Sequence, residues 1–175
     1  QEYFFIAAGL GSIVKNHLQK NPSLDNLADK VCIQLNDTHP AMSIAELMRI
    51  MLDDYGYEWD KAWSIVSKVF AYTNHTVMSE ALEKWPVEYI RTLLPRVYSI
   101  IEEIDRRFRE TVFEKSHDRD LVERMAIIHD NQVRMAHLSI VGSFSVNGVA
   151  KLHTQILVDD LFRDFFNFMP EKFNN

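Results

Sequence analysis

Two consecutive segments, Lys30-Val-Cys-Ile-Gln-Leu35 and Asn36-Asp-Thr-His-Pro40, give the clearest indication of the fold. The first segment is a short apolar run with β-branched residues, which favours a strand. The second consists of polar and turn-forming residues, which favour a loop. Ser43-Ile-Ala-Glu46 then matches a capping box and opens an apolar-periodic segment through Leu52. This order predicts a strand, a loop and a helix.

A second unit of the same kind follows. Residues 59–68 have helical spacing, and Lys68-Val-Phe-Ala-Tyr-Thr73 is another apolar run. It ends in Asn74-His-Thr76, before a helix that we expect to begin near Ser79. The helical connection between the two runs is long enough for parallel pairing. We therefore predict parallel strands near residues 31–35 and 69–73 in a helix-rich α/β fold.

The remaining segments are mostly helical in pattern. Helices are predicted for residues 3–20, 97–112 and 149–161, the last after a turn at Asn147-Gly148. Residues 138–141 fit a short helix or a third strand, and we expect them to be extended. No linker or repeat divides the chain, so residues 1–175 should form a single segment. Since it begins with Gln1 in an apolar helix, we expect it to be a piece of a longer protein.

Composition excludes several classes of protein. The net charge is −6, and no basic cluster is interleaved with aromatic residues, so nucleic acid is not an expected partner. The longest apolar run, Tyr3 to Leu10, is far shorter than a membrane span. Cys32 is the single cysteine, which excludes an intrachain disulfide and favours a reducing compartment such as the cytoplasm.

The two loops after the predicted strands carry the polar groups that could form a site. In open parallel sheets, ligands bind at the carboxyl ends of the strands. Asp37 and His39 follow the first strand, and His75 follows the second. If the strands are neighbours, these three residues face one crevice. They could then bind zinc or iron in a metal-dependent hydrolase, although no fourth ligand or general base is evident.

Two other interpretations of these loops remain open. In the first, Asn36-Asp-Thr38 only caps the next helix and His39 satisfies a backbone group. In the second, the loops bind a hydroxyl-rich ligand such as a sugar, with Trp63 and Trp85 supplying apolar faces. Four other histidines lie on polar or helical stretches and are expected at the surface: His17, His117, His129 and His153.

Longer motifs carry a resemblance to a known family. They are Gln34-Leu-Asn-Asp-Thr-His-Pro40, Ala71-Tyr-Thr-Asn-His-Thr-Val77, Glu80-Ala-Leu-Glu83, Trp85-Pro86 and Val146-Asn-Gly-Val-Ala150. Gln1-Glu-Tyr-Phe-Phe5, Thr92-Leu-Leu-Pro-Arg96 and Met135-Ala-His-Leu138 fit in the same order. In these motifs the chain resembles the glycogen/maltodextrin phosphorylase family from end to end, although it covers only a small central part of that family's polypeptide.

The resemblance implies a fold and an activity. Family members have two Rossmann-like lobes of the GT-B type, and this chain would be the C-terminal part of the N-terminal lobe. They split terminal α-1,4-glucosyl units from a glucan with inorganic phosphate, releasing glucose 1-phosphate, and they use pyridoxal 5′-phosphate. The parent protein would be a homodimer.

The resemblance also implies roles for individual residues. His75 would hydrogen-bond the glucosyl unit, and Val149 would line the side of the sugar's 6-hydroxyl. The pocket beside the anomeric carbon would be lined by Asp37, His39, Ala81 and Glu83. The cofactor lysine belongs to the other lobe, so no residue here is expected to be catalytic, to hold the cofactor or to bind a metal.

Two expectations concern the isolated chain. Without the cofactor lysine it should be inactive, and the surface that its parent covers should make it self-associate. The alternative from another class is a stand-alone helical interaction module, suggested by the short length and the aromatic C-terminal segment.

Overall fold

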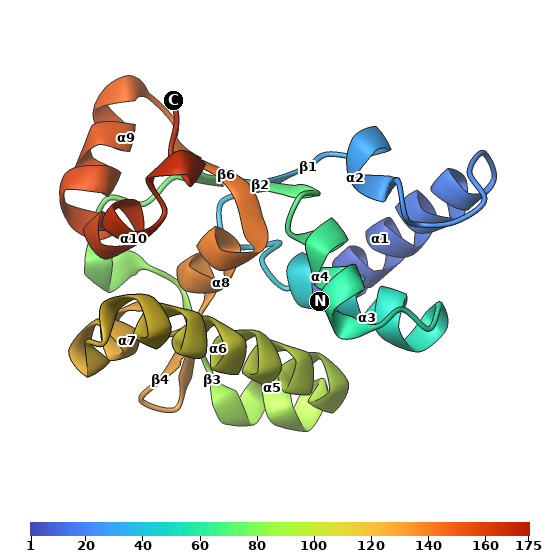
Figure 1. The fold of residues 1–175 in the computed structure, drawn as a ribbon, viewed down its shortest axis with the longest axis horizontal. Coiled ribbons are helices and arrows are strands. Elements are labelled where there is room, and N and C mark those ends of the chain that lie inside the picture. Colours follow the sequence, from blue (N-terminus) through green and yellow to red (C-terminus); the bar gives the residue numbers. More distant parts are fainter.

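A parallel sheet of three strands lies at the centre of the chain in the computed structural model, which describes residues 1–175 (Figure 1). Its strands are β1 (Ile33–Asn36), β2 (Phe70–Asn74) and β6 (Ser143–Gly148), in the order β1-β2-β6. Both pairings are parallel. The prediction of a helix-rich α/β fold with parallel strands near 31–35 and 69–73 is confirmed. β1 begins two residues later than predicted and β2 one residue later, and each ends one residue later.

The first half of the chain supplies helices on one side of the sheet, at the right of Figure 1. They are α1 (Glu2–Leu18), α2 (Leu27–Lys30), α3 (Ser43–Arg49) and α4 (Trp59–Val66), and a π-helical turn (Ile50–Asp54) prolongs α3. The predicted capping box is wrong, because Ser43 is already helical and no side chain caps α3. The Glu46 carboxylate instead accepts hydrogen bonds from the Tyr3 hydroxyl and the Arg49 guanidinium.

The long amphipathic helix predicted for residues 97–112 is confirmed as α6 (Pro95–Ser116). Proline suits the first turn because its missing N–H would have no helical partner there. Its neighbours are α5 (Val87–Leu93) and α7 (Arg119–Met125), and the Asp118 side chain caps α7 by accepting from two backbone N–H groups. In Figure 1 these three helices lie along the bottom of the molecule.

The helix expected near Ser79 is wrong. Only one 3-10 turn (Ser79–Ala81) forms, and β3 (Lys84–Pro86) follows it. This strand joins β4 (Ile128–His129) and β5 (Gln132–Arg134) in a second, antiparallel sheet of order β3-β5-β4. Strands of two or three residues are too short for a periodic pattern, so the sequence carried no signal for this sheet.

The extended structure expected for residues 138–141 is also wrong. These residues belong to α8 (Met135–Gly142), in which every residue is buried. A helix that is buried on all sides has no clear amphipathic period, so its pattern does not distinguish it from a strand. A Cβ on Gly142 would lie 2.5 Å from an Ile44 side-chain atom, so a larger residue here would force the buried Ile44 side chain to shift where α8 packs against α3.

The third strand therefore begins after α8, and Asn147-Gly148 forms its end rather than a turn. The helix predicted for residues 149–161 begins later, as α9 (Lys151–Ile156), and continues into a π-helical turn (Leu157–Leu161). The chain closes with α10 (Arg163–Phe168) and a 3-10 turn (Pro170–Lys172). No helix in the structure has the length and apolarity needed to cross a bilayer.

Candidate functional site

The carboxyl ends of the three parallel strands meet at one edge of the central sheet. Asn36 at the end of β1 pairs with Thr73, and Asn74 at the end of β2 pairs with Gly148 at the end of β6. The residues that follow these ends are Asp37, His75 and Val149. Segments that are far apart in sequence are thus brought together by parallel pairing, at the edge where ligands of such sheets bind.

Asp37 joins the first two strand ends directly. Its backbone has φ 64°, a left-handed conformation that aspartate tolerates better than most residues. One carboxylate oxygen accepts from the Thr38 backbone N–H at 2.6 Å, and the other accepts from the His75 backbone N–H at 3.2 Å. The carboxylate therefore ties the His75 loop to the end of β1.

The His75 side chain is exposed, and the turn that presents it is built on a buried asparagine. Asn74 Oδ1 accepts from the Thr76 backbone N–H at 2.9 Å, and Asn74 Nδ2 donates to the Tyr72 hydroxyl at 2.9 Å. Burial raises the pKa of Tyr72 well above its usual value, so this hydroxyl stays neutral. Asn74 has no exposed surface, so the turn that carries the exposed His75 is anchored in the core.

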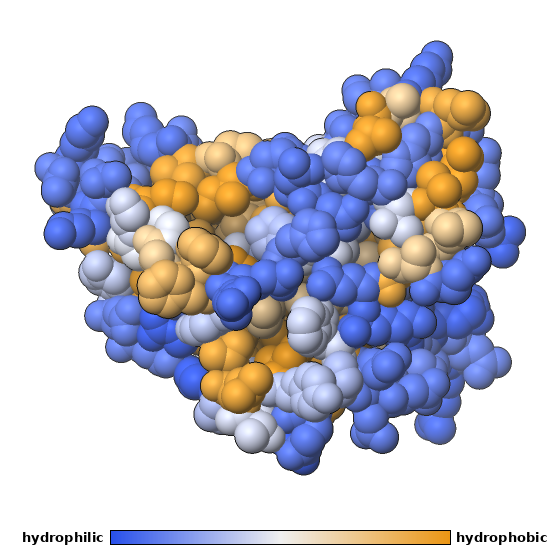
Figure 2. Space-filling model, turned by 180° about the vertical axis from the view of Figure 1, so that it is seen from behind, coloured by the Kyte–Doolittle hydropathy of each residue, from blue (hydrophilic) through white to orange (hydrophobic).

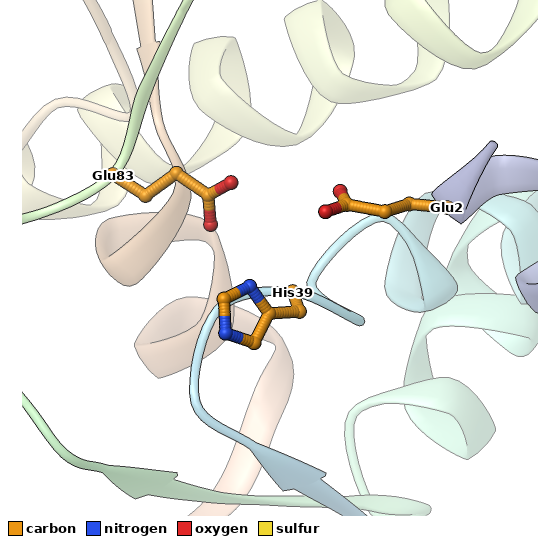
Figure 3. A group of neighbouring side chains, drawn as sticks. All are labelled: Glu2, His39 and Glu83. Atoms are coloured by element: carbon orange, nitrogen blue, oxygen red, sulfur yellow. The ribbon is translucent and has the colours of Figure 1, made fainter.

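His39 lies beside two carboxylates rather than beside His75. One ligand atom each from Glu2, His39 and Glu83 lies within 4.8 Å of the others (Figure 3). Figure 3 shows the two carboxylates facing each other from opposite sides, with the imidazole below them. The metal-ligand set considered from the sequence, Asp37 with His39 and His75, is not assembled at such distances.

The Glu83 carboxylate is fixed by two side-chain hydrogen bonds. It accepts hydrogen bonds from the Thr38 hydroxyl and from Trp85 Nε1, the latter at 2.9 Å. Because Thr38 belongs to the β1 loop and Glu83 precedes β3, this contact joins the second sheet to the edge of the first. Carboxylate oxygens and an unprotonated imidazole nitrogen can accept hydrogen bonds from ligand hydroxyl groups.

Of the other residues expected at the site, Ala81 and Trp85 lie near Glu83, whereas Trp63 lies elsewhere. Ala81 is exposed in the 3-10 turn that precedes Glu83, and Trp85 contacts Glu83. Trp63 does not face the strand ends, because it lines a different cavity of about 490 Å³ with residues of α4, α6 and the C-terminal segment. The expectation that Trp63 supplies an apolar face to this site is therefore wrong.

His153 is a residue of this edge that sequence reasoning assigned to the surface. It is 7% exposed, and His17 is 6% exposed, so both surface assignments are wrong. His153 Nδ1 accepts from the Val149 backbone N–H at 3.2 Å, and Nε2 lies 3.4 Å from the Thr76 carbonyl. The sequence carried no clear signal for this contact, because Val149 lies before the N-cap of α9 and only the packing of α9 against the strand end brings His153 to it.

Comparison with known proteins identifies the family of the chain. The family model described as carbohydrate phosphorylase matches residues 1–175. Glycogen phosphorylase of Bacillus subtilis is 52% identical over 176 residues, and that of Haemophilus influenzae is 49% identical over 179 residues. The muscle form of glycogen phosphorylase from Ovis aries is 46% identical over 187 residues.

These alignments cover 100% of this chain and 22% of each of the three relatives. The chain thus spans about a fifth of the length of the curated relatives that it matches. Because the family model matches the whole length and the relatives share about half of its residues, the chain belongs to the carbohydrate phosphorylase family.

Proposed function

We propose that this chain forms the glucosyl-binding part of an α-1,4-glucan phosphorylase, in the C-terminal part of the N-terminal lobe of a GT-B fold. The whole enzyme would transfer a terminal α-1,4-glucosyl unit to inorganic phosphate, releasing glucose 1-phosphate. Membership of the carbohydrate phosphorylase family supports this, as do relatives named glycogen phosphorylase. The observation that carries the proposal is the hydrogen bond from the His75 backbone to Asp37, which holds two polar loops at one sheet edge.

Each edge residue has a role that its chemistry allows. The exposed His75 imidazole hydrogen-bonds a hydroxyl of the glucosyl unit, and the apolar Val149 side chain lines the side of the 6-hydroxyl. Asp37, His39 and Glu83 lie on the side of the anomeric carbon, with Ala81 beside them. The carboxylates there favour the positive charge that develops on a glucosyl ring during transfer.

Pyridoxal 5′-phosphate does not fit the residues of this edge. The cofactor binds through a lysine Schiff base and needs basic groups for its phosphate. The residues proposed for the pocket are acidic, imidazole or apolar side chains and include no lysine or arginine: Asp37, His39, His75, Ala81, Glu83 and Val149. In this proposal the cofactor is held by other parts of the parent polypeptide, so the isolated chain should release no glucose 1-phosphate from glycogen.

The same proposal covers the substrates, the oligomeric state and the cellular compartment of the parent enzyme. Its partners are an α-1,4-glucan and inorganic phosphate, it is a homodimer, and it acts in the cytoplasm. The absence of a membrane-spanning helix and the single cysteine are compatible with that compartment.

The test uses the full-length protein that carries this chain. Phosphorolysis of a maltodextrin is measured as glucose 1-phosphate release for the unmodified protein and for His75→Ala. Losing a hydrogen bond to the substrate should lower kcat/KM by about 10- to 100-fold. His129→Ala is the control, because His129 is partly exposed beside Glu123 and Asp130 on the second sheet. No glucose 1-phosphate from the unmodified protein, or no effect of His75→Ala, would contradict the proposal.

A further inference from the structure

His153 lies beneath the strand-end site and connects two of its loops. It belongs to the first turn of α9 and is buried, whereas His75 and Val149 are exposed above it. Its Nδ1 atom accepts from the Val149 backbone N–H at 3.2 Å. Its Nε2 atom lies 3.4 Å from the carbonyl oxygen of Thr76, the residue after His75.

These two contacts define the state of the imidazole ring. A backbone N–H can only donate, so Nδ1 must be unprotonated to accept from Val149. A backbone carbonyl can only accept, so Nε2 must carry the hydrogen that faces Thr76. The neutral ring with its hydrogen on Nε2 satisfies both contacts. Since both ring nitrogens are occupied by the backbone, His153 has none left to contact a substrate.

The backbone before Val149 is packed tightly against the same helix. Gly148 N donates to Thr154 Oγ1 at 3.0 Å. A Cβ on Gly148 would lie 2.8 Å from the Thr154 backbone N and 2.9 Å from His153 Cγ. Gly148 therefore packs directly against His153 and Thr154 of α9, so the His153 side chain lies in a tightly packed position at the strand end.

We infer that His153 is a positioning residue that sets the separation between Val149 and the His75 loop, and through it the selection of the sugar's hydroxymethyl group. The inference rests on the proposed function, in which Val149 lines the 6-hydroxyl side of a glucosyl pocket. A pocket whose walls are held at a set separation distinguishes a hexose from the pentose that lacks this group. A loosened pocket loses that distinction before it loses the ability to bind a sugar ring.

The test measures donor selectivity in the full-length protein. Glucan elongation is followed with α-D-glucose 1-phosphate and with α-D-xylose 1-phosphate, whose sugar lacks the hydroxymethyl group. In both reactions the sugar's bond to the phosphate oxygen breaks, a bond to the primer's 4-hydroxyl oxygen forms, and that hydroxyl's proton leaves with the phosphate. The readout is the ratio of kcat/KM for the two donors, with kcat and KM determined separately.

Three variants of His153 distinguish the effect of its contact with Val149 from that of its contact with Thr76. His153→Phe keeps an aromatic ring but removes both nitrogens. His153→Asn keeps an acceptor near the position of Nδ1, so it preserves the Val149 contact, whereas His153→Gln keeps a donor near the position of Nε2 and preserves the Thr76 contact. We expect the glucose-to-xylose ratio to fall about tenfold in the Phe and Gln variants, and clearly less in the Asn variant.

His17→Phe is the matched control. His17 is equally buried, at 6% exposed, and hydrogen-bonds the Ser23 carbonyl and the Asn26 side chain at the other end of the sequence. This variant should lower thermal stability without changing the ratio of the two donors. The comparison separates a loss of positioning from a general loss of stability.

The outcomes distinguish the inference from the proposed function. An unchanged ratio in His153→Phe and His153→Gln overturns the inference, whatever the change in stability. If His153→Phe does not fold, the Gln variant decides: a ratio about tenfold below that of the unmodified protein supports the inference, and an unchanged ratio overturns it. If the unmodified protein transfers no glucosyl unit from glucose 1-phosphate, the proposed function fails and the inference fails with it.

Discussion

Asp37 Oδ2 accepts a hydrogen bond from the backbone N–H of His75 at 3.2 Å, across 38 positions of sequence. The two residues follow neighbouring strands, so parallel pairing brings the donor and the acceptor to the same edge. A partly exposed carboxylate at a sheet edge would otherwise be free to change rotamer. Here it is held on both oxygens by backbone N–H groups, because the Thr38 N–H binds the other one.

Replacement of Asp37 by alanine should destabilise the chain by about 1–3 kcal/mol. Two backbone donors lose their acceptor, and a residue with φ 64° loses the side chain that tolerates this conformation. Asp37→Gly loses the same hydrogen bonds but has no penalty from a Cβ at positive φ. Urea denaturation of the two variants separates the effects, and equal stability of Ala and Gly would show that the backbone contributes nothing.

Replacement of Gly148 by alanine should be more harmful than a glycine change elsewhere. The new Cβ would lie 2.8 Å from the Thr154 backbone N, which is closer than van der Waals contact, so β6 and α9 must separate. Overpacking of this kind costs about 1–3 kcal/mol. The matched control is Gly9→Ala in α1, where nothing lies within 4 Å and alanine should stabilise the helix. Thermal unfolding of both variants checks the prediction, which is wrong if both melt alike.

His137 should make stability fall as the pH is lowered from 7 to 4. Burial, with a smaller contribution from the Arg134 charge, lowers the pKa of His137 from 6.5 to about 4. Above pH 6.5 the histidine is neutral in both states and has no effect. Below that pH only the unfolded chain takes up the proton, so stability declines until the folded chain is protonated near pH 4. The decline amounts to about 3 kcal/mol.

The measurement is the free energy of unfolding against pH for the unmodified chain and for His137→Phe. The phenylalanine variant should lack this part of the pH dependence, because no buried imidazole remains to be protonated. His129→Gln, at a partly exposed histidine, should keep it. Parallel curves for the unmodified chain and His137→Phe would show that protonation of His137 does not cause the loss of stability.

The isolated chain should self-associate. Phe4, Phe5 and Leu93 are 71%, 73% and 76% exposed, and an apolar groove of about 560 Å³ lies where α1 meets α5. Figure 2, from behind, shows apolar side chains gathered in several surface patches. Exposed apolar area of this extent promotes association in water. Sedimentation velocity checks this, and Phe4→Ser with Leu93→Ser should shift the chain toward the monomer. A monomer of the unmodified chain that binds no hydrophobic dye would refute this prediction.

The sequence alone predicted the elements whose residues alternate between two environments. The strand near 31–35 and helix α6 have one face in the core and one toward solvent, so their side-chain periods report the structure. The wholly buried α8 has no such contrast, and its helical state is decided by packing against its neighbours. The short strands of the second sheet likewise depend on partners elsewhere in the chain.

The same division holds for the site. Local chemistry and motif order identified Asp37, His39 and His75, because strand-end polar loops can be recognised along the sequence. Only the tertiary structure decided which of them meet: Asp37 contacts His75, whereas His39 lies with Glu2 and Glu83. It also decided that His153 is buried beneath Val149. Residue types and spacings determine which groups are available at a strand end, but contacts between distant segments depend on strand order and helix packing, which no local pattern specifies.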